Sequence, residues 1–165
     1  MTGDSRSALI EQYRRGHAEV VQALEAVTAG ELDQRRVPTE WSIREVVHHL
    51  ADSEMIAAVR LRRLVAEESP VIRGFDQELY ARRLRYDSRP IEAALLVIEA
   101  TRATTVELLG TISEADWQRT GIHTEQGVYT RERWLELNAG HTHEHAEEIR
   151  RNRAAWAVRE MGLPG

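Results

Sequence analysis

Residues 41–62 have the sequence WSIREVVHHLADSEMIAAVRLR and carry the start signal and the periodicity of a long amphipathic helix. Ser42 followed by Glu45 is a capping-box pattern, which marks a helix N-terminus. Apolar side chains then recur every three or four residues to about Glu67, at Ile43, Val46, Val47, Leu50, Ala57, Leu61 and Leu64. The pattern predicts a helix that buries one face in a core.

Three further segments have the same period, so the fold class is predicted to be all-α. The apolar row from Leu9 to Val27 predicts a first helix. Pro90 suits the first turn of a third helix, and Thr130 is a candidate N-cap for a last helix that runs to about Arg159. The connections are expected to hold short extra helices and a small hairpin or loop around Gly127. We therefore expect one four-helix bundle domain over residues 1–165.

The composition excludes several kinds of chemistry. The chain contains no cysteine, and all 22 of its basic residues are arginine. Disulfides, thiolate ligands, a protein thiol nucleophile and lysine-based catalysis are therefore excluded. A net charge of −5 argues against a nucleic-acid partner. No apolar run approaches a membrane span and the N-terminus lacks a signal-peptide pattern, so we expect a cytoplasmic protein without a membrane partner.

The last predicted helix contains NAGHTHEHAEEIRR at residues 138–151, with three alternating histidines. At about 100° per residue, His141 and His145 lie one turn apart in the middle of the apolar stripe. His143 projects to the opposite side, which we expect to face solvent. Of the remaining histidines, His17 is expected in the core and His123 in an exposed loop.

Two core histidines need partners for their ring nitrogens. They either hydrogen-bond to each other or to carboxylates, or they bind a metal ion, and spacing alone does not decide between these readings. A metal would need a further ligand from a facing helix, where periodicity does not choose between His48 and His49. Glu54 lies near the centre of an apolar row. It either pairs with a core arginine or histidine, or lies near the metal, where it hydrogen-bonds to a ligand or contacts the substrate.

Other metal-binding patterns do not fit. A ferritin-like di-iron site needs two Glu-x-x-His motifs, and this chain has one, Glu45-x-x-His48, in which Glu45 already serves as a cap residue. The zincin motif H-E-x-x-H is absent.

The stretch WSIREVVHHLADSEMIAAVRLR together with HTHEHAEEIRR resembles the DinB-like metalloenzymes, most closely the YfiT branch, which includes bacillithiol S-transferases. The resemblance implies a four-helix bundle in which three histidines hold one divalent metal, usually zinc or nickel. It implies His49, the histidine directly before LAD, with His141 and His145 as the ligands. Glu54 and Glu148 stand where the branch has histidines, and neither is a ligand position.

The resemblance further implies a function. Three histidines leave a coordination position open, as in catalytic sites. We expect a metal-dependent S-transferase in which a low-molecular-weight thiol, with bacillithiol as the leading candidate, attacks an electrophilic substrate. A metal-dependent hydrolase is the alternative, and a non-catalytic metal-binding stress protein is a third reading. The apolar positions Ile56 and Val59 would suit the interface of a homodimer.

Overall fold

The computed structural model describes residues 1–162, which form four long helices, two short helices, a 3-10 turn and three short strands. The predicted four-helix bundle with short extra helices in its connections is confirmed. The elements are α1 (Gly3–Ala23), α2 (Ala29–Asp33), α3 (Ile43–Ala66), β1 (Val71–Ile72), α4 (Gln77–Arg83), α5 (Glu92–Leu109), η1 (Asp116–Gln118), β2 (Thr120–His123), β3 (Gly127–Thr130) and α6 (Arg131–Glu160).

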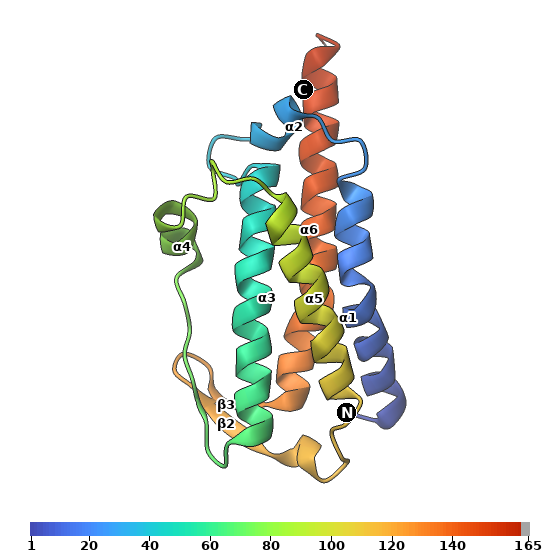
Figure 1. Cartoon of the computed structure of the whole chain (residues 1–165), viewed down its shortest axis with the longest axis vertical. Helices are drawn as coiled ribbons and strands as arrows, with labels where there is room; N and C mark the ends of the chain where they lie inside the picture. Colours follow the sequence, from blue (N-terminus) through green and yellow to red (C-terminus); the bar gives the residue numbers. More distant parts are fainter. Residues whose placement is uncertain (163–165) are drawn as a thin grey trace.

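The four long helices do not alternate in direction along the chain. In Figure 1, α1 and α6 run upward, whereas α3 and α5 both run downward. Since two helices that run the same way cannot be joined by a tight turn, the chain returns along the bundle after α3, through β1 and α4, before α5 begins. This return segment lies beside α3 and contributes residues to the pockets described below.

Local capping signals determine where the helices begin. The Ser42 side chain accepts from the Glu45 amide, and the Glu45 carboxylate accepts from the Ser42 amide, so the predicted capping box starts α3. Thr130 caps α6 as predicted. Two boundaries differ from the prediction. Helix α5 begins at Glu92, so Pro90 lies just before the helix, and α1 ends at Ala23, before the turn that carries Val27.

The bundle interior consists of two apolar clusters separated by a polar layer. The first cluster contains Val20, Val46, Leu50, Ile98 and Ile149, and the second contains Tyr13, Leu61, Leu109, Trp134 and Leu135. Between them along the four long helices lie Gly16, Glu54, Arg102 and Thr142, all buried. A side chain at Gly16 would collide with Thr142 and Arg102, so only glycine lets α1 approach this layer.

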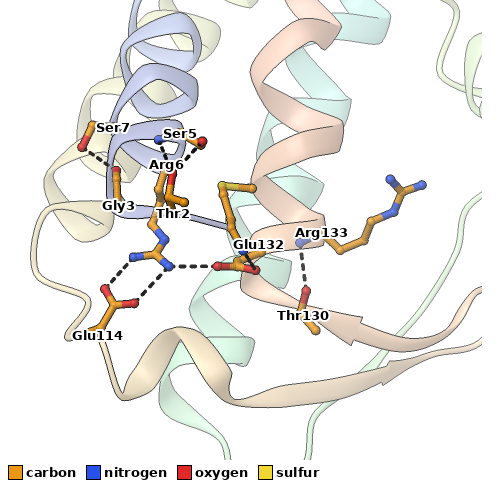
Figure 2. Close-up of polar contacts among 10 residues, drawn as sticks. Thr2, Gly3, Ser5, Arg6, Ser7, Glu114, Thr130, Glu132 and Arg133 are labelled. Carbon is orange, nitrogen blue, oxygen red and sulfur yellow. Dashed lines mark hydrogen bonds and ion pairs between the residues drawn. The ribbon is translucent and has the colours of Figure 1, made fainter.

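At the end of the bundle next to the sheet, ion pairs connect the start of α1 to residues near η1 and at the start of α6. Figure 2 shows the Arg6 guanidinium of α1 between two carboxylates, donating to Glu114 at 2.7 Å and to Glu132 at 2.9 Å. Arg6 also lies over the Trp117 ring, with its guanidinium carbon 4.5 Å from the ring centroid. Because Arg6 is only 5% exposed, these contacts fix the start of α1 against η1 and α6.

The small sheet overturns the expectation that His123 is exposed. Strand β1 pairs with β2 in parallel, and β2 pairs with β3 in the predicted hairpin. His123 is paired with Ile72 at the inner end of β2, packs on Tyr129 and is 3% exposed. His17, expected in the core, is only partly buried. Within residues 1–162, no helix combines the length and the apolar character needed to cross a membrane.

Candidate metal centre

Three histidines from two neighbouring helices converge in the middle of the bundle. His49 comes from α3, and His141 and His145 lie one turn apart on α6. One ring nitrogen from each lies within 4.8 Å of the other two, and the Nε2 atoms of His49 and His141 are 3.3 Å apart. The ring centroids are 4.8 to 5.3 Å from one another. The three imidazoles therefore surround one point.

The other two histidines of these stretches point elsewhere. His48, the neighbour of His49, places its Nε2 3.1 Å from the carbonyl of Arg89 and stacks on Tyr86. His143, expected to face solvent, is instead partly buried, with its Nε2 2.9 Å from the carbonyl of Gln12. That expectation was wrong because α1 packs on this face of α6, where Ala139 is also fully buried.

Burial keeps two of the converging rings, His49 and His141, neutral. Desolvation, reinforced by the neighbouring histidines, lowers the pKa of His49 from its ordinary 6.5 to about 2. Burial, reinforced by His145 and by the Arg102 charge, lowers the pKa of His141 to about 3. At neutral pH both rings therefore present an unprotonated nitrogen, which is the form that binds metal.

The spacing of two of the nitrogens, those of His49 and His141, fits a tetrahedral cation. Zinc–nitrogen bonds of about 2.0–2.1 Å place two ligand nitrogens roughly 3.3–3.4 Å apart in a tetrahedron. The observed separation between His49 and His141 is 3.3 Å. This distance also suits an N–H···N hydrogen bond, but such a bond would join only two of the three nitrogens, whereas one cation satisfies all three. The donor set therefore fits a zinc-type divalent ion.

Glu148 orients one of the three rings. Its Oε2 lies 2.7 Å from Nδ1 of His145, so that Nδ1 donates and the lone pair of the opposite ring nitrogen is left for the centre. In the sequence, Glu148 was notable only because it stands where the resembling family has a histidine. A carboxylate three residues after a candidate ligand on the same helix would have been the signal for this role.

Trp41 covers the site from the N-terminal end of α3. Its ring centroid is 4.6 Å from that of His49 and 6.5 Å from that of His145, over which it stacks. The indole therefore shields two of the three imidazoles from bulk solvent.

Two pockets adjoin the histidines. A pocket of about 380 Å³ is lined by His49 and His141 at one end and extends along α3 to Arg60 and Tyr129. A smaller pocket of about 240 Å³ lies beside His145, Trp41 and Glu148. The larger pocket offers space for a small organic molecule next to the candidate metal position.

The structure places Glu54 in an ion pair with a core arginine. The Arg102 guanidinium donates to one carboxylate oxygen of Glu54, and the Tyr13 hydroxyl donates to the other at 2.7 Å. Burial raises the pKa of Glu54, and the Arg102 charge and the Tyr13 hydroxyl oppose that rise. Among residues 1–162, Glu54 makes no hydrogen bond to a histidine.

Comparisons with known proteins point to one family. The sequence model of the DinB superfamily matches residues 12–149. A relative from Oceanobacillus iheyensis is 38% identical over 109 residues, which span 66% of this chain and 63% of that protein. A relative from Bacillus subtilis, YfiT, is 29% identical over 133 residues, which span 80% of this chain and 75% of the relative. Both relatives carry the name "putative metal-dependent hydrolase".

The solved structure of Bacillus subtilis YfiT has the same fold as this chain. The two superpose with a TM-score of 0.86 at 26% sequence identity, over 99% of this chain and 91% of the other. That protein is described as "a probable metal-dependent hydrolase with an unusual four-helix bundle topology". The parallel course of α3 and α5 is the feature of the present chain that departs from an alternating bundle.

Proposed function

Because this chain belongs to the DinB superfamily, we propose that it is a metal-dependent enzyme that transfers a low-molecular-weight thiol to an electrophilic substrate. In this proposal His49, His141 and His145 hold one divalent cation, with zinc as the first candidate and nickel as the second. Bacillithiol is the leading candidate for the thiol. The observation that carries the proposal is the convergence of three imidazoles beside a 380 Å³ pocket that His49 and His141 line.

The donor set defines the chemistry. Three protein ligands leave the fourth position of a tetrahedral ion open, which is the arrangement of catalytic rather than structural sites. A cation held there would act as a Lewis acid that lowers the pKa of a coordinated thiol or water molecule. His49 and His141 line the large pocket, so a substrate bound in that pocket lies against two of the three ligands.

The side chains around the pocket favour a thiol as the nucleophile. Among the residues that the structure describes, no aspartate or glutamate lines the large pocket. A carboxylate is one of the groups that serve as a base for attack by water, whereas a coordinated thiol is deprotonated outright. In the transfer, the S–H proton leaves to solvent, a carbon–sulfur bond forms, and the leaving group departs with its electron pair. Since the chain has no cysteine, the sulfur must come from a separate thiol.

A metal-dependent hydrolase is the second candidate. The names of the relatives favour it, and so does one feature of the smaller pocket, which brings Glu78 close to His145 and Trp41. Among residues 1–162, the Glu78 carboxylate accepts one hydrogen bond, from the Trp41 indole nitrogen at 3.4 Å, and is therefore available as a base on that side of the site.

The test begins with protein purified without a polyhistidine tag, so that column nickel does not fill the site. The zinc-loaded protein is incubated with 1-chloro-2,4-dinitrobenzene and bacillithiol, mycothiol or glutathione, and conjugate and chloride are measured. We expect conjugation that depends on the thiol and is lost, together with bound zinc, in His141→Ala. The matched variant His143→Ala should retain both.

Other outcomes decide against the transferase. Cleavage of ester or amide substrates without thiol consumption would support the hydrolase. Tight zinc binding without either activity would support a non-catalytic metal-binding protein. Equal loss of zinc from His141→Ala and His143→Ala would contradict the proposed ligand set.

A further inference from the structure

The large pocket ends in an arginine that has no carboxylate partner. Arg60 lies on α3 and lines the pocket whose other end is formed by His49 and His141. Among residues 1–162, it forms no ion pair, whereas the buried Arg102 pairs with Glu54 and the buried Arg6 pairs with Glu114. Arg60 is thus a positive charge at the far end of the pocket from the candidate centre; the Glu125 carboxylate lies near enough to act on its charge but forms no ion pair with it.

The hydrogen bonding of Arg60 is also incomplete. Its Nη2 donates to the carbonyl of Arg73 at 2.5 Å, and its guanidinium carbon lies 5.7 Å from the Phe75 ring centroid. Its Nε is buried without a partner, and its Nη1 makes no hydrogen bond to the described residues. Arginine stays charged in proteins, and an unsatisfied buried donor costs roughly 1–3 kcal/mol. The group is therefore oriented by two contacts and still has donors to offer.

Neutral polar groups accompany this charge. The Tyr129 ring is 2% exposed, lines the same pocket and makes no side-chain hydrogen bond within residues 1–162. The amides of Gln126 and Asn138 line the pocket as well. One guanidinium with neutral donors around it matches a singly charged carboxylate better than a phosphate dianion, which would call for a second positive charge.

We propose that Arg60 is the anion-binding residue of the substrate pocket and that the thiol used by this protein carries a carboxylate distant from its sulfur. The inference rests on the proposed function and adds a substrate class to it. Eleven residues of helix separate His49 from Arg60, which is a rise of about 16 Å. The arginine side chain leans back toward the helix N-terminus and shortens that span. A ligand with its sulfur at the histidines must nevertheless be extended to reach the guanidinium.

Matched probes separate the two ends of such a ligand. 6-Mercaptohexanoate carries both a thiol and a distant carboxylate, 6-mercaptohexanol lacks the charge, and 3-mercaptopropionate is too short to span the pocket. Calorimetric titration into the zinc-loaded protein gives the dissociation constant of each. We expect Arg60→Gln to weaken 6-mercaptohexanoate binding about 10-fold or more, since a hydrogen bond to a charged group contributes roughly 1.5–3 kcal/mol. Binding of 6-mercaptohexanol and of 3-mercaptopropionate should change little.

Two variants control for structure. Arg63 lies one turn further along α3 and pairs with Glu67 outside the large pocket, so Arg63→Gln should leave all three constants unchanged. Arg60→Lys keeps the charge and should retain much of the preference for the carboxylate, even if Arg60→Gln folds poorly. Zinc content and melting temperature of each variant report whether the centre and the fold are intact.

A sulfur-free probe keeps this inference distinct from the proposed function. Hexanoate titrated into the metal-free protein should bind more weakly to Arg60→Gln than to the parent, whether or not thiols bind to the zinc. If the zinc-loaded protein binds no thiol but hexanoate binding depends on Arg60, the transferase proposal fails and the anion site stands. If neither hexanoate nor 6-mercaptohexanoate distinguishes Arg60→Gln from the parent, the anion site is overturned.

Discussion

Replacing Glu54 by alanine tests whether this buried carboxylate supports the fold or the metal centre. Glu54 and Arg102 are 1% and 2% exposed, so Glu54→Ala leaves a guanidinium buried without its counter-charge. It also removes the acceptor of the Tyr13 hydroxyl. Breaking a buried ion pair by removing one partner costs about 3–5 kcal/mol. For a chain of this length, each kcal/mol lowers the melting temperature by about 2–4 °C, so we expect a fall of about 6–20 °C.

The assay is thermal unfolding of the metal-free protein, followed by far-UV circular dichroism, together with a zinc titration at a temperature where the variants are folded. The variant Glu67→Ala breaks the exposed Arg63–Glu67 pair on the same helix and should change the melting temperature little. The double variant Glu54→Leu/Arg102→Met removes both charges. It should be more stable than Glu54→Ala, because no unpaired charge stays buried.

Zinc affinity separates the two roles of Glu54. Because its hydrogen bonds go to Arg102 and Tyr13, we expect zinc affinity to stay close to that of the parent in Glu54→Ala. A variant that keeps its melting temperature but loses zinc would refute this reasoning and make Glu54 part of the metal centre.

Three further predictions concern the same region. Glu148→Ala removes the hydrogen-bond acceptor that orients His145 and should weaken zinc binding about 10- to 100-fold, measured by competition with a chelator. An unchanged zinc affinity would contradict the orienting role of Glu148. Gly16→Ala forces a methyl group against Arg102 and should lower the free energy of unfolding, measured in urea, by about 1–3 kcal/mol. An unchanged free energy of unfolding would show that the side chains of the polar layer can move aside without cost. The pKa values of His49 and His141 are lower in the folded metal-free protein than in the unfolded chain, so the stability they contribute is fully present above pH 6.5 and is lost as the pH falls toward 3. Urea midpoints measured between pH 7 and 4 should therefore decline more steeply for the parent than for His49→Gln, and parallel curves would count against the shifted pKa values.

Features written into short stretches of sequence were predictable. The capping box at Ser42 and the cap at Thr130 depend on residues three positions apart, and both are present in the structure. The shared face of His141 and His145 follows from helical spacing alone, and the two rings do meet. The four-helix bundle followed from the same periodicity.

Features that depend on distant segments were not predictable from periodicity. His123 is buried because a two-residue strand, Val71–Ile72, pairs with β2 from about fifty residues away, and so short a segment carries no pattern of its own. The error for His143 has a related cause. A projection of α6 identifies one apolar stripe, but α1 covers a second face of that helix. The buried residue of α6 on this face is Ala139, and a side chain as small as alanine gives little hydrophobic signal in the sequence.

Which of His48 and His49 faces the candidate metal position depends partly on local sequence and partly on a distant segment. Both flank the apolar row of α3, and only the position of α6 decides which ring meets the pair. Arg60 gave no signal at all in the sequence, where it is one of 22 arginines. Its distinction, a place in the lining of the pocket that also contains His49 and His141, exists only in three dimensions.

The origin of the histidines on two helices couples ion retention to the state of the whole chain. Two of the rings are four residues apart and stay close in any helical fragment, but the third is 92 residues away from its nearest neighbour in the site. An ion bound by all three would therefore cross-link the first and last thirds of the polypeptide. The loop that this cross-link closes includes α4 and α5. Because the unfolded chain does not hold the three rings together, unfolding of the bundle should release the ion, and a bound ion should raise the melting temperature above that of the metal-free protein.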